Sequence, residues 1–174
     1  MRAWECLPLA RARIGSGLCL EVPVRCDGSG SLVIGNGNCL GYRPAPRLGN
    51  GEILLQPRGD KAEIIIGDNN TFSNNVTVIA TARITIGHGC QIGDQVAIYD
   101  SDFHAVDPAQ RTQSRGTSEP VAIGNNVWLG SRALILKGVT IGDNSVVGAM
   151  SVVTKPVPAN CVVAGIPAKV VRQF

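Results

Sequence analysis

Aromatic side chains are scarce in this sequence of 174 residues: Phe, Trp and Tyr together make up 4% of it, whereas hydrophobic residues make up 44%. The apolar residues are mainly Val, Ile, Ala and Leu, and glycine occurs 21 times. A core of small and β-branched side chains favours strands over helices. The length suits one domain that is large enough to bury a core.

Strong net charge and long apolar runs are also missing. The formal net charge of +3 argues against a nucleic-acid-binding protein, although it favours a small polyanionic ligand. No stretch approaches the ~20 apolar residues that a membrane-spanning helix needs. The N-terminal residues lack the order of regions found in a secretory signal. We therefore expect a cytoplasmic protein without a membrane span.

The cysteines form no CxxC pair, and we expect them to be reduced residues that pack inside the protein. They are Cys6, Cys19, Cys26, Cys39, Cys90 and Cys161. With only two histidines, His88 and His104, a zinc site built from three histidine ligands is not expected, which argues against a carbonic anhydrase.

An aliphatic residue recurs at every sixth position. In the C-terminal half these residues are Ile123, Leu129, Ile135, Ile141, Val147 and Val153. The same spacing runs from Ile66 to Ile84 and from Ile86 to Ile98, and it is looser nearer the N-terminus. A period of six fits neither an amphipathic helix, with a period of about 3.6, nor an alternating strand, with a period of about two.

This period predicts an all-β fold, a left-handed parallel β-helix of triangular cross-section. Each six-residue unit is one short strand and a corner, with the aliphatic side chain pointing inward. Gly, Asn and Asp turn the corners because they tolerate left-handed backbone angles. We expect a single domain over residues 1–174, whose flat outer faces associate into a trimer of parallel prisms.

Two segments interrupt the repeat. The segment of about residues 99–121 contains "DSDFHAVDPAQR", which includes His104. A prism wall has no cavity, so we expect this segment to leave the wall as a protruding loop that builds a site. The other segment, about residues 41–63, contains Pro44, Pro46 and Pro57 and is expected to be irregular.

Three blocks carry a family resemblance. The block from Glu119 to the C-terminus contains "VWLGS", "TKPVP" and "AGIPAKVV", the loop has His104 seven residues before Arg111, and "TFSNNVTV" surrounds Asn74. They resemble the left-handed β-helix, hexapeptide-repeat acyltransferases, most closely the galactoside and maltose (sugar) O-acetyltransferases. The resemblance covers about residues 64–174. The first sixty residues look like additional coils rather than the helical cap of the sugar acetyltransferases.

The resemblance implies that His104 is the general base. An isolated loop histidine is more often a surface residue, but imidazole can exchange a proton near neutral pH, and the loop position matches. A base of this kind needs a group that fixes its tautomer. Asp100, Asp102, Asp107, Glu119 or a backbone carbonyl could serve, and our preference is Asp102.

The resemblance also implies that acetyl-CoA lies in a groove between neighbouring prisms. Ser131 would lie near the thioester and Ala149 would line the pantetheine groove. Thr154, Lys155 and Arg172 would hold the pantetheine and the phosphates. Asn74 would lie near the reacting atoms, although an asparagine there also suits a left-handed corner. No metal is expected.

The acceptor is less defined by the sequence. Asp102, Arg111 and Trp128 are candidates for binding it, and Trp128 also suits packing against a neighbouring subunit. A saccharide hydroxyl ranks first as the acceptor. An N-acetyltransferase acting on an amino-sugar nucleotide, a serine acceptor and a non-catalytic solenoid scaffold remain alternatives.

Overall fold

The computed structural model describes residues 4–6 and 11–174, with side chains described from residue 11 onward. Within these ranges the regular structure consists of short strands, and no helix occurs. The strands are β1 (Trp4–Cys6), β2 (Ala12–Ile14), β3 (Cys19–Leu20), β4 (Val24–Cys26), β5 (Ser31–Ile34), β6 (Cys39–Leu40), β7 (Ile53–Pro57), β8 (Glu63–Ile66), β9 (Thr71–Phe72), β10 (Thr77–Ala80), β11 (Arg83–Ile86), β12 (Gln91–Ile92), β13 (Ala97–Tyr99), β14 (Val121–Ile123), β15 (Trp128–Leu129), β16 (Leu134–Ile135), β17 (Thr140–Ile141), β18 (Val146–Val147), β19 (Val152–Val153), β20 (Cys161–Gly165) and β21 (Ala168–Gln173).

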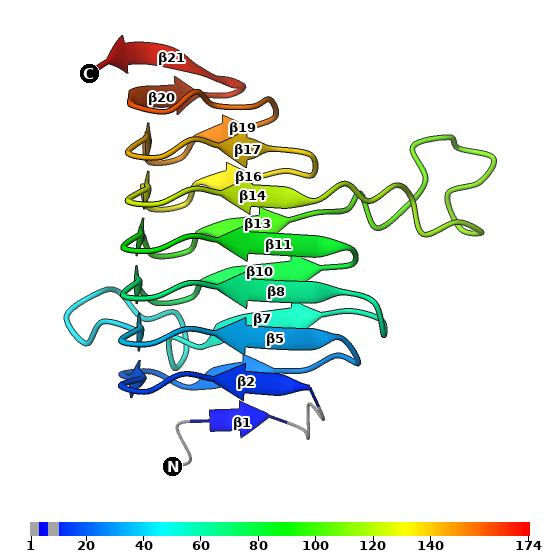
Figure 1. Cartoon of the computed structure of the whole chain (residues 1–174). Helices are drawn as coiled ribbons and strands as arrows, with labels where there is room; N and C mark the ends of the chain where they lie inside the picture. Colours follow the sequence, from blue (N-terminus) through cyan, green and yellow to red (C-terminus); the bar gives the residue numbers. More distant parts are fainter. Residues whose placement is uncertain (1–3, 7–10) are drawn as a thin grey trace.

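From β1 to β19, successive strands fall in turn on three sheets, which form the walls of a prism, and β20 and β21 both belong to the third sheet (Figure 1). Sheet A has the order β1-β4-β7-β10-β13-β16-β19, sheet B has β2-β5-β8-β11-β14-β17, and sheet C has β3-β6-β9-β12-β15-β18-β20-β21. Neighbouring strands pair in parallel, except β20 and β21, which are antiparallel. The pairing brings Ile98, Ile135 and Val153 into one register on sheet A. The prediction of a parallel β-helix is confirmed.

The aliphatic residues of the six-residue period point into the prism and form its core. Ile14 and Leu20 are exceptions at the N-terminal end of the described column: Ile14 is 44% exposed, and Leu20 is partly buried. The ring of Phe72 is fully buried in the same column, so the prism has room for one aromatic side chain. The buried members of the period are Cys26, Ile34, Leu40, Ile66, Phe72, Val78, Ile84, Ile86, Ile92, Ile98, Ile123, Leu129, Ile135, Ile141, Val147 and Val153.

Side-chain acceptors connect one coil to the next at the BC corner, the turns that lead from sheet B to sheet C. His88 shows the pattern: its Nδ1 accepts the N–H of Asp68 at 2.9 Å, and its own N–H donates to Oδ1 of Asn125 at 3.0 Å. Its side chain is 61% exposed. This histidine therefore has a structural role at the corner, away from the protruding loop.

Two excursions leave the prism at different corners. Residues 100–120, between β13 and β14, project away from the wall as predicted for the loop (Figure 1). Residues 41–52, between β6 and β7, form the other excursion on the opposite side of the view. The expected irregular segment of about residues 41–63 is too long, because Ile53–Pro57 is a regular strand of sheet A. Pro57 is its last residue, a position where proline is compatible with a strand.

A search of the described residues for membrane-spanning segments finds no helix that is long and apolar enough to cross a bilayer.

Candidate functional site

The protruding loop belongs to the AB corner, the turns that lead from sheet A to sheet B. Residues from several other coils stack along the same corner, among them charged and predicted ones. In order along the prism they are Arg58 to Lys61 after β7, Thr81 after β10, the loop after β13, Lys137 after β16, and Thr154 and Lys155 after β19. The regular register of the coils therefore surrounds the loop with residues that lie far away in sequence.

The first residue of the loop anchors it to the coil below. Asp100 is fully buried, and its carboxylate accepts hydrogen bonds from the backbone N–H groups of Thr81 and Ala82, both at 2.7 Å. Its backbone oxygen accepts the N–H of Glu119 at 2.8 Å. Charge-assisted bonds to a buried carboxylate are strong. Asp100 thus fixes both ends of the loop and is not available to orient His104.

Lys137, from the next coil towards the C-terminus, holds together the outgoing and returning segments at the base of the loop, like a clamp. Its Nζ lies 2.8 Å from Oδ2 of Asp102 on the outgoing strand and 3.5 Å from Oε1 of Glu119 on the returning strand. It also donates to the hydroxyl of Thr117. The hydrogen bond from Lys137 lowers the pKa of Asp102, and the hydrogen bond to Asp102 raises the pKa of Lys137. The clamp therefore consists of charged groups at neutral pH.

Two unusual backbone conformations place His104. Phe103 has φ of 62°, a left-handed angle that is uncommon for a bulky residue, and its ring stacks edge-on against Tyr99 at 5.6 Å and under the guanidinium of Arg58 at 5.0 Å. Gly116, with φ of 72°, packs so closely that a Cβ there would lie 2.6 Å from the backbone oxygen of His104. A side chain at position 116 would displace the histidine.

His104 itself is exposed and lines a hollow of about 810 Å³ at the AB corner. No described residue hydrogen-bonds its imidazole. The prediction that Asp102 orients His104 is wrong, because the Asp102 carboxylate binds Lys137 and Thr117 instead. Of the other candidates, Asp107 accepts the N–H of Ala109 and Glu119 pairs with Lys137. The imidazole is thus open to a ligand.

Arg111, a candidate for binding the acceptor, lies near His104 on the loop. Both residues, together with Arg115, line a second hollow of about 690 Å³ within the loop. The guanidinium of Arg111 donates to the backbone oxygen of Val106 at 3.0 Å, which leaves most of its donors available. Trp128 does not reach this place within one chain. It is 54% exposed on sheet C and lines a separate hollow of about 230 Å³ with Tyr42.

The predicted residues Asn74, Ser131 and Ala149 stack at a different edge, the CA corner, where sheet C leads to sheet A. The prediction that Asn74 lies near the reacting atoms is wrong, because its side chain is fully buried and cannot face a ligand there. Its amide donates to the backbone oxygens of Tyr42 and Ala45 at 3.0 and 3.1 Å, and its Oδ1 accepts the N–H of Tyr42 at 2.9 Å. Asn74 therefore anchors residues 41–52 to the prism. The left-handed corner residue is Asn75, with φ of 60°.

Ser131 and Ala149 lie in successive coils at this corner, where both are accessible, and we call this pair of residues the step. Each follows a glycine, Gly130 or Gly148, and the backbone oxygen of Ser131 accepts the N–H of Met150 at 2.9 Å. Neither the hydroxyl nor the N–H of Ser131 makes a hydrogen bond with another described residue. Ala149 is exposed. The step has free donors and little side-chain bulk, which suits a narrow ligand.

The remaining predicted residues are exposed near the C-terminal end of the prism. Thr154 and Lys155 turn the AB corner after β19, and Arg172 lies on β21 with its guanidinium 5.4 Å from the ring of Phe174. Neither cation forms an ion pair with a described carboxylate. Both are free to bind phosphate groups.

Lys137 and Gly116 were not identified from the sequence. The repeat could have revealed Lys137. This residue follows the inward residue Ile135 by two positions, which places it at the corner from which the loop leaves. Nothing in the sequence marks Gly116, since its close approach to His104 depends on how the loop folds back.

We expect Lys137→Met to lower kcat by about three- to tenfold, because the loop base loosens and His104 loses its position. KM for acetyl-CoA should stay unchanged, and Lys137→Arg should restore most of the activity. Because the pKa of Asp102 is lowered, the clamp is complete above the ordinary carboxyl pKa of about 4. It is lost as the pH falls through the lowered pKa. Steady-state kinetics of the three proteins would reveal the effect, and a changed KM with unchanged kcat would contradict it.

Comparisons with known proteins indicate the family of the chain. The family model described as bacterial transferase hexapeptide (six repeats) matches residues 120–155. The galactoside O-acetyltransferase of Escherichia coli (strain K12) is 43% identical over 113 residues, which cover 65% of this chain and 55% of that protein. This chain thus spans little more than half the length of that curated relative.

Solved structures match over most of the chain. A hexapeptide-repeat acetyltransferase of Vibrio cholerae, complexed with acetyl-CoA, is 30% identical with a TM-score of 0.65, and the match covers 91% of this chain and 69% of that one. A polysialic acid O-acetyltransferase is 29% identical with a TM-score of 0.71, over 93% and 74% of the two chains. The chain belongs to the hexapeptide-repeat acetyltransferase family. Its fold is the left-handed β-helix, and the resemblance to the sugar O-acetyltransferases is confirmed.

Proposed function

We propose that the protein is an acetyl-CoA-dependent O-acetyltransferase that acts on a saccharide hydroxyl, with His104 as the general base. The observation that carries this proposal is the open imidazole of His104, which a clamped loop holds over a hollow of about 810 Å³. The similar proteins whose names contain O-acetyltransferase support the reaction class. The whole protein's substrates and assembly are part of the same proposal.

In this mechanism His104 removes the proton of the acceptor hydroxyl as the hydroxyl oxygen attacks the thioester carbonyl. The carbon–sulfur bond then breaks, and the imidazolium gives its proton to the departing thiolate. The Ser131 N–H or hydroxyl stabilises the oxyanion between these steps. No covalent enzyme intermediate is needed. Burial raises the pKa of the thiol of Cys90, which makes it a poor nucleophile near neutral pH.

The residues present fit acetyl-CoA as the co-substrate. The step at Ser131 and Ala149 has room and free donors for the thioester and pantetheine arm, and Lys155 and Arg172 are cations that no described carboxylate neutralises. Coenzyme A carries several phosphate charges, for which such cations are suitable ligands. Within the described residues, no group of three or more His, Cys, Asp or Glu is arranged to hold a metal ion.

The complete site would require two copies of the chain. His104 leaves the AB corner, whereas Ser131 and Ala149 lie at the CA corner, and the width of sheet A separates these two edges. A loop that projects from one prism can reach the CA corner of a neighbouring prism. Closed symmetry makes a homotrimer with a site at each interface the simplest such assembly. We also propose a cytoplasmic location.

A direct test is to measure thiol release from acetyl-CoA with mono-, oligo- and nucleotide-sugars as acceptors. We expect turnover with saccharides that offer a free hydroxyl, and the product should be an ester that mild base cleaves. A product acetylated on nitrogen would point to an amino-sugar acceptor. If no acceptor gives turnover and acetyl-CoA does not bind, the protein is a non-catalytic solenoid and the proposal fails.

A further inference from the structure

The hollow beneath His104 is lined by cations without ionic partners. Arg58, Lys61 and Arg115 line it, and Asp60 is the acidic residue in its wall. None of the three cations forms an ion pair with a described carboxylate, although Arg58 donates to the side chain of Gln56. By contrast, Lys137 on the other side of the loop is paired with Asp102 and Glu119. The hollow therefore has an excess of positive charge.

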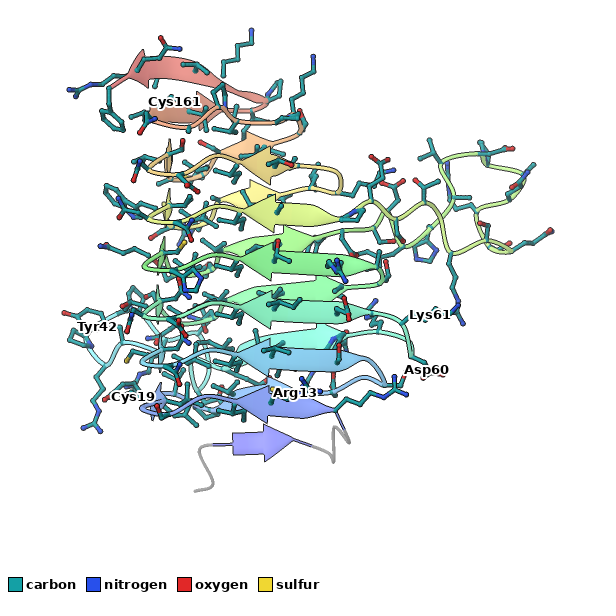
Figure 2. All side chains as sticks on the ribbon, in the orientation of Figure 1. Arg13, Cys19, Tyr42, Asp60, Lys61 and Cys161 are labelled. Carbon is teal, nitrogen blue, oxygen red and sulfur yellow. The ribbon has the colours of Figure 1, made fainter. Side chains whose placement is uncertain are left out.

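The excess extends along the prism towards its N-terminal end. A neighbouring hollow of about 610 Å³ shares Asp60 and Lys61 with the first and adds Arg11 and Arg13. Figure 2 shows Asp60 and Lys61 at the edge of the prism below the loop, with Arg13 on a lower strand. Arg11 donates to the backbone oxygen of Asp60 at 3.0 Å, so its charge remains unpaired. Of the two acids in this second hollow, Glu63 is paired with Arg83, so Asp60 is left as the single carboxylate among these cations.

On the loop side, His104 and Arg115 are shared with the hollow that contains Arg111. Neighbouring hollows share lining residues, and together the three make up a cationic region, called the cationic groove below, that extends from the loop over the AB corner to the outer face of sheet B. Its cations are Arg11, Arg13, Arg58, Lys61, Arg111 and Arg115. Since the net charge of the whole chain is only +3, this concentration on one edge is not a general property of the surface.

We propose that the acceptor is an anionic saccharide, bearing carboxylate or phosphate groups, whose acidic units lie in the cationic groove while the target hydroxyl faces His104. This inference rests on the proposed O-acetyltransferase function and names its substrate class. The groove extends from the loop towards the N-terminal end of the prism, whereas the cations assigned to coenzyme A, Lys155 and Arg172, lie on the C-terminal side of the loop. The groove is therefore additional to what the co-substrate requires.

The chemistry of the groove suits such a ligand. Guanidinium groups bind carboxylate and phosphate through two parallel hydrogen bonds. The guanidinium of Arg58 lies over the Phe103 ring and uses its Nε for Gln56, so its two terminal nitrogens remain available for such bonds. Two adjoining hollows of about 810 and 610 Å³ provide room for more than one sugar unit. An oligosaccharide with repeated negative charges fits better than a monosaccharide.

The test compares an oligosaccharide of uronic acids with the same oligosaccharide after its carboxylates have been reduced to alcohols. Acetyl transfer to each is measured for the wild type, Lys61→Ala, Arg115→Ala and Arg115→Lys. Arg25→Ala is the matched control, because it removes one positive charge from sheet A outside the groove. A phosphorylated oligosaccharide is tested in parallel.

We expect the wild type to prefer the charged oligosaccharide, with a KM that rises as salt screens the groove. Lys61→Ala and Arg115→Ala should each raise that KM by about tenfold, the effect of losing one charge-assisted hydrogen bond. KM for acetyl-CoA and the kinetics with the reduced oligosaccharide should not change. Arg115→Lys should lose less than Arg115→Ala, and Arg25→Ala should match the wild type.

Two results would overturn the inference. If both oligosaccharides are acetylated equally well, the protein is a saccharide O-acetyltransferase without selection for charge, and only this inference fails. If the variants raise KM for acetyl-CoA and leave the acceptor kinetics unchanged, the groove binds the coenzyme phosphates. Absence of turnover with every saccharide would instead refute the proposed function itself.

Discussion

Replacing His104 by Ala or Asn should lower kcat for acetyl transfer by about 10²–10⁴-fold, the usual contribution of a general base. His104 is the proposed base, and its imidazole is exposed to the hollow with no described side chain bound to it. Neither replacement can accept the hydroxyl proton. Asn keeps a hydrogen-bonding group of similar reach, so it separates loss of proton transfer from loss of acceptor binding.

The same variants should keep their assembly and their affinity for acetyl-CoA. His104 lies on the loop, away from the buried column of the prism, so its removal should not change the thermal unfolding midpoint. Rates are measured by thiol release at saturating acceptor, and coenzyme binding by calorimetry. Near-wild-type turnover in the purified His104→Ala protein would mean that another group is the base.

Placing a large side chain at Ala149 should abolish use of acetyl-CoA at ordinary concentrations. Ala149 is exposed at the CA corner next to Ser131, so Ala149→Trp can be accommodated without disturbing the buried core. The indole would fill the groove where the pantetheine arm is proposed to lie. We expect KM for acetyl-CoA to rise by about 100-fold, equivalent to about 2.7 kcal/mol of binding free energy.

Ala149→Ser is the matched control, since it adds a single oxygen at the same position and should bind acetyl-CoA nearly as well as the wild type. Calorimetric titration with coenzyme A gives the affinities, and circular dichroism confirms that both variants are folded. Unchanged affinity in folded Ala149→Trp would place the co-substrate elsewhere on the prism.

The regular parts of the molecule could be predicted from the sequence because each coil repeats the same pattern of inward aliphatic side chains and corner residues. Ile98, Ile135 and Val153 had to point inward for the prism to have a core, and parallel pairing puts them in register. The same register allowed the resemblance to place Ser131 and Ala149 on one corner. Where the chain follows the repeat, position in sequence determines position in space.

Predictions from sequence were less successful where the chain leaves the repeat. Asn74 matched a family position, yet residues 41–52 fold over it and occupy its amide. Asp102 was the preferred partner of His104 because it is close in sequence, but its carboxylate is paired with Lys137 from another coil. Hydrogen bonds between a loop and a distant coil cannot be inferred from spacing along the chain. The cationic groove was missed for the same reason, because its residues come from three separate segments.

The most direct test of the central claim, that one site is built by two chains, is to mix two inactive variants. His104→Ala keeps an intact CA corner, and Ala149→Trp keeps an intact loop. If they are refolded together in equal amounts, about a quarter of the interfaces in random trimers combine the two intact halves. We therefore predict about a quarter of wild-type activity from the mixture, against nearly none from either variant alone. A mixture no more active than its components would show that each chain builds its site by itself.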